Sequence, residues 1–199
     1  MTGNIFYNYG DKLYINITNR CSSDCVFCIR RNGDSVGNAK SLWLEREPTV
    51  EEIKSDFDRQ DLNNISEIVF CGYGEPMERA EDVIEVCKYI KSKTEIRVRL
   101  NTNGQVKLIN PQFNVSEIAV LDSVSISLNA DNAVDYQKLT RSKFGEIAFS
   151  SLLDFAKEAK QYTLVFFSVV GVSDSSLNIE KCEKLSQQLG IDLRVRFYE

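Results

Sequence analysis

The chain contains no histidine among its 199 residues, and this absence excludes several kinds of active site. No zinc site can use an imidazole ligand, and no serine or cysteine can be activated by a histidine base. Proton transfer would fall to carboxylates, lysine, tyrosine or thiol. A long apolar run is also missing. The longest near-continuous one, LVFFSVVGV at 164–172, is far shorter than the roughly 20 residues of a membrane helix.

The N-terminal segment lacks the basic and apolar regions of a secretory signal, so we expect a cytoplasmic protein whose thiols stay reduced. The net charge is −5 and the sequence pI is near 5.0, whereas nucleic-acid-binding domains usually carry a basic footprint. Net charge therefore does not indicate a nucleic-acid partner. With 43% hydrophobic and 27% charged residues, and no linker or internal repeat, we expect one globular domain over 1–199.

Short β-branched or apolar runs alternate with segments of helical periodicity along the whole chain. One helix start is marked by a capping box, Thr49 followed three residues later by Glu52. Repeated strand–helix units predict a parallel sheet, either open and doubly wound or barrel-like, with functional groups at the carboxyl ends of the strands. The expected strands are 12–18, 67–72, 96–101, 123–129, 164–170 and 192–198, and the expected helices are 49–60, 80–90, 149–156 and 179–189, with a weaker one at 104–122 broken by Pro111.

Three of the six cysteines, Cys21, Cys25 and Cys28, follow the first expected strand within eight positions. The spacing CxxxCxxC would also place them on one helix face, as a buried stripe. The polar, turn-like residues around them argue against a helix. Disulfides do not suit a reducing compartment, and a structural zinc site needs four ligands. Three thiolates instead suit an iron–sulfur cluster with one iron left open, while Cys87 and Cys182 are expected in the core.

The cysteine motif, with Phe27 directly before its last cysteine, resembles the signature of the radical S-adenosylmethionine (radical SAM) enzymes. GYGEP at 72–76 resembles the glycine-rich GGEP motif of that family, with Tyr73 in place of the second glycine, and SLNA at 127–130 resembles the polar end of its fourth strand. LWLEREPT at 42–49, FCGYGEP at 70–76, LNTNG at 100–104 and FGE at 144–146 resemble the TatD-associated radical SAM proteins over nearly the whole chain. The resemblance implies a partial (βα)6 TIM-like barrel of parallel strands.

The resemblance also implies the cofactors. Cys21, Cys25 and Cys28 would ligate three irons of a [4Fe-4S] cluster, and the fourth iron would bind the amino and carboxylate groups of S-adenosylmethionine (SAM). An external one-electron donor of the flavodoxin or ferredoxin type would drive cleavage of SAM to a 5′-deoxyadenosyl radical, which abstracts hydrogen from an unidentified substrate. The implied SAM contacts are Gly72, Tyr73, Gly74 and Glu75 for the methionine ammonium, Asn101, Asn103, Ser127 and Asn129 for ribose or carboxylate, Ser168 for the same ligand, and the Phe27 carbonyl for adenine.

Two parts of the sequence could contact the substrate, and each has an alternative structural role. Trp43 lies in a long loop after the cysteines, where it could recognise an anionic or planar substrate or simply pin the loop. Arg194 and Arg196 could reach the site or both face solvent. A partial barrel with an open side would admit a macromolecule.

A rival function is a non-catalytic metal-binding or redox-sensing module. Cys71, or a partner, would then complete a four-thiolate zinc or iron–sulfur site. Under that function, GYGEP and the asparagines at the strand ends would have no role.

Overall fold

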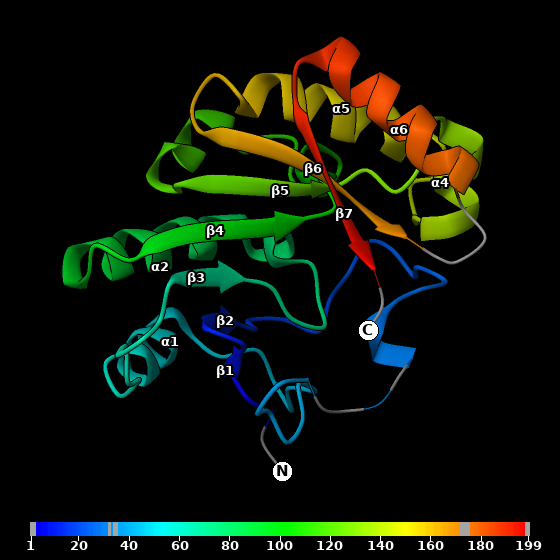
Figure 1. Cartoon of the computed structure of the whole chain (residues 1–199). Coiled ribbons are helices and arrows are strands. Elements are labelled where there is room, and N and C mark those ends of the chain that lie inside the picture. The colour runs from blue at the N-terminus through cyan, green and yellow to red at the C-terminus, as the bar shows by residue number, and fades with distance from the viewer. Residues whose placement is uncertain (1–2, 32, 34–35, 172–175, 198–199) are drawn as a thin grey trace.

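The computed structural model describes residues 3–31, 33, 36–171 and 176–197, and is built on a seven-stranded sheet in the order β1 to β7 (Figure 1). Every neighbouring pair from β2 onward is parallel, and the sheet is open at both edges. The expected partial barrel of alternating strands and helices is confirmed. Its strands are β1 Phe6–Tyr9, β2 Lys12–Ile15, β3 Glu67–Phe70, β4 Arg97–Thr102, β5 Ser123–Ser127, β6 Leu164–Gly171 and β7 Asp192–Phe197.

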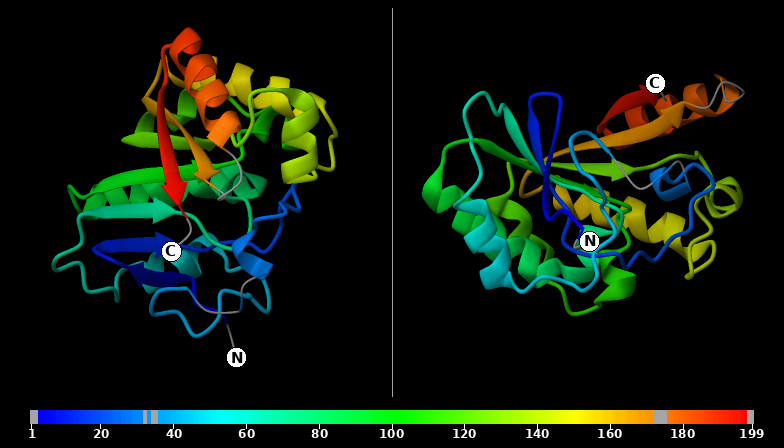
Figure 2. Two further views of the ribbon diagram at one scale, coloured as in Figure 1. Left: turned by 45° about the vertical axis from the view of Figure 1, so that its right-hand side comes forward. Right: turned by 90° about the horizontal axis from the view of Figure 1, so that it is seen from below.

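The helices connect successive parallel strands, and most of them lie behind the sheet in Figure 1, while the last one, α6 (Ser176–Leu189), lies beside β7. Figure 2, seen from below, shows them covering one side of the curved sheet. The first α-helix has the expected capping box, in which the Thr49 side chain accepts from the Glu52 N–H. The elements are η1 Ile29–Arg31, α1 Val50–Phe57, η2 Pro76–Arg79, α2 Ala80–Lys93, α3 Val106–Ile109, η3 Val115–Val120, α4 Ala133–Thr140, α5 Ile147–Ala159 and α6 Ser176–Leu189.

Alternate residues of each strand divide between two faces of the sheet. The outward face, typified by Ile68, Leu100 and Ile126, packs against the helices in one continuous apolar core. Cys87 and Cys182 are fully buried there, as expected. The inner face, which Figure 1 looks onto, is largely polar. The core therefore lies between sheet and helices and leaves the inner face for binding.

The sequence analysis missed β1, which forms an antiparallel hairpin with β2. The two-residue turn is Gly10-Asp11, and Gly10 has a φ of 60° that glycine adopts without strain. Two short runs separated by a glycine-containing pair are a recognised hairpin signal, so the information was present. The hairpin supplies an extra edge strand beside the first parallel strand.

Two other elements differ from expectation. The segment 104–122 forms α3 and η3, separated at Pro111, in place of one helix. Helix α4 was not expected; its start is capped by Asn132, whose Oδ1 accepts from the Asp135 N–H at 2.9 Å. The last expected strand extended to residue 198, which lies outside the described residues.

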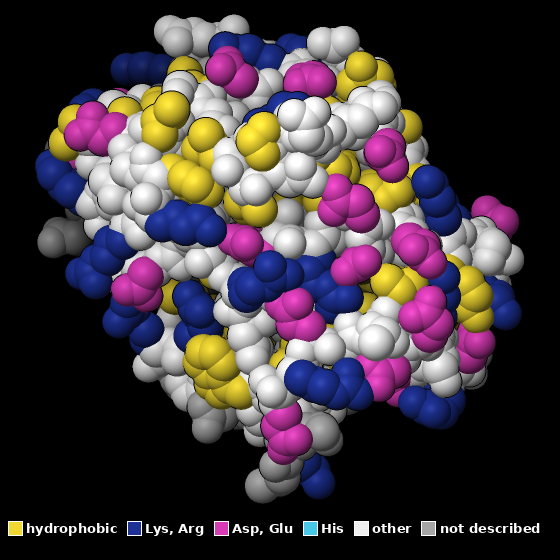
Figure 3. All heavy atoms as spheres, turned by 180° about the vertical axis from the view of Figure 1, so that it is seen from behind, with side chains coloured by type: hydrophobic (Ala, Val, Ile, Leu, Met, Phe, Trp, Pro, Cys, Tyr) yellow, Lys and Arg dark blue, Asp and Glu magenta, His cyan; other side chains and the backbone are white. Residues whose placement is uncertain are grey.

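Seen from behind, the helical side of the molecule carries lysine and arginine interleaved with aspartate and glutamate (Figure 3). The net charge of −5 is therefore not concentrated on this face. No helix within the described ranges has the length and apolar character to cross a membrane.

Candidate functional site

The three clustered cysteines lie in a loop that follows β2 at the carboxyl end of the parallel strands. In Figure 1 this loop runs on the right, where the arrowheads of β3 to β5 point. Residues 21–28 are not helical, so the three sulfurs do not form a buried helix stripe. The loop is held by backbone bonds to the end of α4 and the segment after it: Asp24 N to Thr140 O at 3.0 Å, Val26 N to Leu139 O at 2.9 Å and Lys143 N to Ser22 O at 2.8 Å.

Gln105, which the sequence analysis did not single out, is the buried hub beneath this loop. Its Oε1 accepts from the hydroxyls of Ser22 and Ser142 at 3.0 and 2.9 Å. Its Nε2 donates to Ser23 Oγ at 3.2 Å and to the Tyr136 hydroxyl at 3.0 Å. All five side chains are buried, and Gln105 is 0% exposed. A fully satisfied buried network of this kind fixes the position of the segment it holds.

The thiols themselves are free and partly exposed. Burial raises the pKa values of Cys21 and Cys25 to about 12, and the neighbouring thiols add to the effect at Cys25. Two sulfurs receive N–H donors: Ser23 N lies 3.4 Å from Cys21 Sγ, and Arg30 Nε lies 3.4 Å from Cys28 Sγ. A metal would therefore be needed to hold Cys21 and Cys25 as thiolates.

The donor set fits an iron–sulfur cluster better than a single ion. Within the described residues, no three cysteine or carboxylate side chains gather closely enough to hold one metal ion. A cubane cluster binds each thiolate through a different iron, so its ligands stand apart and need not converge. N–H donors to the sulfurs also suit a cluster, because such bonds stabilise its negative charge. The residues present fit a [4Fe-4S] cluster.

The glycines of GYGEP allow two segments of backbone to touch. A Cβ at Gly74 would lie 2.3 Å from Thr18 O and 2.6 Å from Arg20 O, and one at Gly72 would lie 2.1 Å from Asn16 Oδ1. Glu75 N donates to Arg20 O at 2.8 Å. The motif therefore packs directly against the chain that leads into the cysteine loop, which explains the need for glycine at both positions.

Glu75 is buried, and its carboxylate accepts hydrogen bonds from the chain itself. Oε1 accepts from Thr102 Oγ1 at 2.6 Å and from Met77 N at 3.1 Å, and Oε2 accepts from Asn103 N at 2.7 Å. The side chain thus caps η2 and ties the segment that follows β3 to the end of β4. Its suggested contact with the methionine ammonium stays a prediction. Burial raises the pKa of Glu75 to about 7, against the lowering effect of these donors.

This shift gives a test by pH. A carboxyl group whose pKa is raised on folding stabilises the fold below its unfolded pKa of about 4.5, and that contribution is lost as the pH rises through about 7. Between pH 5 and 8 the free energy of unfolding of the metal-free protein should fall by about 2 to 3 kcal/mol relative to Glu75→Gln. Urea unfolding of both proteins at several pH values measures the difference. A constant difference would show that Glu75 is already ionised at pH 5 in the folded protein.

The other polar residues suggested for SAM lie along the same edge. Asn103 joins it to the cysteine loop, since its Nδ2 donates to Ser22 Oγ at 2.9 Å. Asn101 Oδ1 accepts from Arg99 Nη1 at 2.5 Å. Ser127 and Ser168 are neighbours in the β5–β6 register. Asn129 has a φ of 54° and accepts from Val170 N at 3.2 Å. The structure therefore gathers these residues at one edge, with Phe27 half-buried inside the cysteine loop.

Two asparagines missed in the sequence analysis fix the loop that contains Trp43. Asn16 Nδ2 donates to Leu42 O at 2.8 Å, and Asn19 exchanges two bonds with the backbone of Leu44. Both leucines are buried, at 0% and 8% exposed, so they pin the loop. A polar asparagine at the end of an otherwise apolar strand was the available signal.

Trp43 lies on the surface between these anchors. The residue is 39% exposed, and its ring lies edge-on to Tyr73 with the two ring centroids 5.0 Å apart, while the Arg30 guanidinium lies 5.9 Å from the indole centroid. Tyr73, which takes the place of a glycine in the motif, is thus a packing partner of the loop and also donates to the Gly33 carbonyl at 2.5 Å. The buried leucines thus anchor the loop, whereas a role of the exposed indole in substrate recognition stays a prediction.

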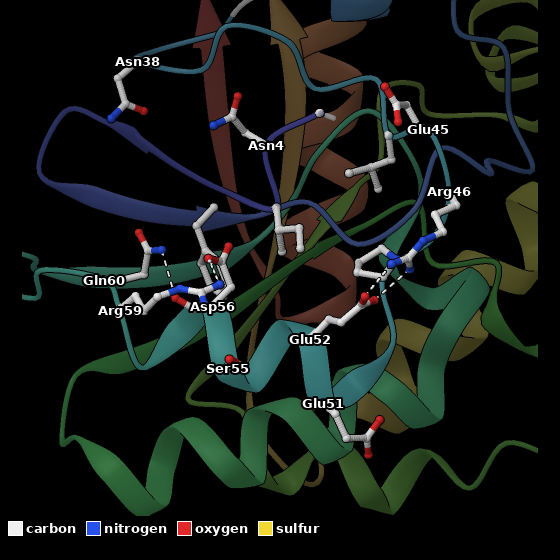
Figure 4. A pocket seen from close by; sticks show the side chains of 15 residues that line it. Asn4, Asn38, Glu45, Arg46, Glu51, Glu52, Ser55, Asp56, Arg59 and Gln60 are labelled. Atoms are coloured by element: carbon white, nitrogen blue, oxygen red, sulfur yellow. Dashed lines mark hydrogen bonds and ion pairs between the residues drawn. The ribbon is translucent and has the colours of Figure 1, made fainter. Parts of the chain in front are cut away.

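A hollow of about 1050 Å³ lies between β1 and α1 (Figure 4). It shares no residue with the cysteine loop or GYGEP. Its charged side chains are largely paired with each other, as Arg46 with Glu52 and Arg59 with Asp56. This hollow is separate from the candidate site.

Comparison with known proteins gives consistent results. A family model described as the radical SAM superfamily matches residues 15–181. A probable GTP 3′,8-cyclase of Methanocaldococcus jannaschii is 33% identical over 135 residues, covering 68% of this chain and 41% of that protein. A probable dual-specificity RNA methyltransferase RlmN of Caldicellulosiruptor saccharolyticus is 26% identical over 176 residues, covering 85% and 49%. The chain thus spans less than half of each of these relatives.

Solved structures share the fold at low identity. Native anSMEcpe with bound AdoMet superposes with a TM-score of 0.61 at 19% identity, over 92% of this chain and 50% of that one. An archaeal TYW1 crystal structure gives 0.60 at 13% identity, over 94% and 64%.

Proposed function

The chain belongs to the radical SAM superfamily, and we propose that it binds a [4Fe-4S] cluster and SAM and cleaves SAM reductively to act on a further substrate. The observation that carries the proposal is the cysteine loop. It presents three free, partly exposed thiols at the carboxyl ends of the strands, with N–H donors on two of the sulfurs. Three thiolates leave one iron of a cluster open for an amino acid chelate.

The chain's own residues supply position and shielding. Gln105 holds the cysteine loop from beneath through its bonds to Ser22 and Ser23. The packing of Gly74 against Thr18 and Arg20 fixes GYGEP beside it. When both cofactors are bound, they supply the reductive cleavage of the SAM carbon–sulfur bond, which yields methionine and, after hydrogen abstraction from a substrate, 5′-deoxyadenosine. Asn103, Ser127, Asn129 and Ser168 are our proposed SAM-binding residues, together with Asn101, the backbone of 72–75 and the Phe27 carbonyl.

Two further statements belong to the proposal. The electron comes from an external one-electron donor of the flavodoxin or ferredoxin type, and the reaction takes place in the cytoplasm, where thiols stay reduced. We also propose membership of the TatD-associated subgroup. Its support is the sequence motifs. One of them, 42–49, also contacts the entry to the cysteine loop, where Glu47 accepts from Arg20 Nε at 2.7 Å.

The test is anaerobic reconstitution with iron and sulfide, followed by dithionite and SAM, with 5′-deoxyadenosine measured by mass spectrometry. We expect a brown protein containing close to four irons per chain and product that depends on dithionite. A fully loaded protein that binds no SAM, seen as an unchanged electron paramagnetic resonance signal of the reduced cluster, would contradict the proposal. That result would favour the non-catalytic binding module.

A further inference from the structure

The inner face of the sheet carries arginines that are not among the proposed SAM-binding residues. In the β6–β7 register, Ser168 pairs with Arg194 and Val170 with Arg196. The intervening Leu193 and Val195 pack into the helical core, so both arginines of β7 project from the opposite, inner face. Neither arginine therefore lies on the face of the sheet that the helices cover.

Both guanidinium groups fold back over β6. Arg194 Cζ lies 3.4 Å from the centroid of Phe166, a ring that is only 4% exposed. Arg196 Nη2 donates to Ser168 Oγ at 2.5 Å, and this serine is 1% exposed. Both arginines are thus ordered by inner-face partners and remain accessible at the surface of that face.

These positive charges are not neutralised by the chain. In the part of the protein that the structure describes, ion pairs hold Arg99 to Glu67 at 2.9 Å, but neither Arg194 nor Arg196 pairs with a carboxylate. Burial lowers the pKa of Arg196, and Arg99 acts in the same direction as a second nearby cation. An accessible arginine without a carboxylate partner on the chain can bind an anion such as phosphate.

The two guanidinium groups suit a ligand that carries a phosphate next to a planar ring. Arginine binds phosphate through two parallel N–H bonds, and its guanidinium plane stacks on nucleobases. We propose that Arg196 binds the phosphate of the substrate, that Arg194 over Phe166 stacks on its base, and that the substrate is a free nucleotide. This inference rests on the proposed function and names its substrate class.

The test measures equilibrium binding, so it does not depend on turnover. Reconstituted protein, saturated with SAM and without reductant, is dialysed against each common ribonucleoside 5′-triphosphate, against the matching nucleosides and against inorganic pyrophosphate. We expect one triphosphate to bind, its nucleoside to bind far more weakly, and pyrophosphate to compete. Arg194→Gln and Arg196→Gln should each weaken binding about 10- to 100-fold, as charge-assisted hydrogen bonds to phosphate imply.

The matched control is Arg97→Gln, which removes the same charge from an exposed position at the amino end of β4 and should change affinity less than about twofold. Arg194→Lys keeps the charge but not the plane, and should bind pyrophosphate while losing the preference for a base. Each variant is first checked for iron content, which should match the wild type. SAM affinity should match the wild type in both Arg194 variants, because the Arg194 guanidinium lies over Phe166 and not on a proposed SAM-binding residue.

Three results would overturn the inference. They are wild-type protein that binds none of the triphosphates, Arg194 variants that lose SAM affinity along with or in place of nucleotide affinity, and an RNA oligonucleotide that binds where free nucleotides do not. Iron loading and SAM cleavage, measured on the same samples, separate the two proposals. SAM cleavage without nucleotide binding would contradict only the nucleotide site. Loss of both iron loading and SAM cleavage in the wild type would contradict the proposed function.

Discussion

Cys25→Ser is expected to abolish cluster assembly and to lower the formation of 5′-deoxyadenosine to the background of protein without iron. Cys25 is one of the three free thiols of the loop, and the backbone carbonyl next to its side chain accepts from Cys28 N at 3.1 Å. Losing one of only three protein ligands leaves two irons open, and a cubane with two protein ligands is not retained. Iron and sulfide analysis, the visible spectrum and mass spectrometry of the product measure the effect.

The remaining cysteines provide matched controls. Cys182→Ser changes a fully buried thiol on α6, away from the loop, and should lower stability without changing iron per folded chain. Cys71→Ala is the sharper comparison, because Cys71 directly follows β3 and is the candidate fourth ligand of the rival module. Full loading and cleavage in Cys71→Ala is the expected result. Loss of iron in that variant would contradict the three-thiolate site and restore the four-thiolate alternative.

Gln105→Met should cost about 3 to 5 kcal/mol in the free energy of unfolding, since it removes four buried hydrogen bonds and each contributes roughly 0.5 to 1.5 kcal/mol. The replacement is close in size but removes every hydrogen bond of the hub. Four buried hydroxyls, on Ser22, Ser23, Tyr136 and Ser142, then lose a partner. Such a loss is a large part of the roughly 5 to 15 kcal/mol that stabilises a typical domain. Urea unfolding of the metal-free protein measures it.

The same variant should also load less iron, because Ser22 and Ser23 lie between Cys21 and Cys25 in the loop that the hub supports. Gln188→Met, on an exposed position of α6, is the control and should change stability by less than about 0.5 kcal/mol. If Gln105→Met unfolds within about 1 kcal/mol of the wild type, water replaces the side chain and the hub does not position the loop.

Local sequence patterns were sufficient where local forces decide the structure. The six parallel strands begin within one residue of their expected positions because apolar runs with β-branched residues mark buried strands. The cysteine loop lies at the carboxyl edge for the same reason, since it directly follows β2. Thr49 and Glu52 cap α1 as expected, because both partners lie within four residues of each other.

Contacts between distant segments were not predictable in this way. Gln105 bonds to side chains 82 and 83 positions earlier in the chain, and no periodicity in either segment signals such a pair. Glycine at 72 and 74 likewise matched a motif, but its physical reason, contact with Asn16 and Thr18, needs the fold. Arg194 and Arg196 share a face by strand alternation alone, yet only the pairing of β7 with β6 shows that this face is the inner one.

The position of Trp43 has an optical consequence. It is the only tryptophan of the chain, and Arg30, 5.9 Å from its ring, is also the residue that donates to Cys28 Sγ. Iron–sulfur clusters absorb broadly across the wavelengths at which indole emits. A cluster bound at Cys28 would therefore quench the fluorescence of Trp43 by energy transfer. Intrinsic fluorescence would therefore report, without any attached dye, how fast the cluster assembles and how fast air destroys it.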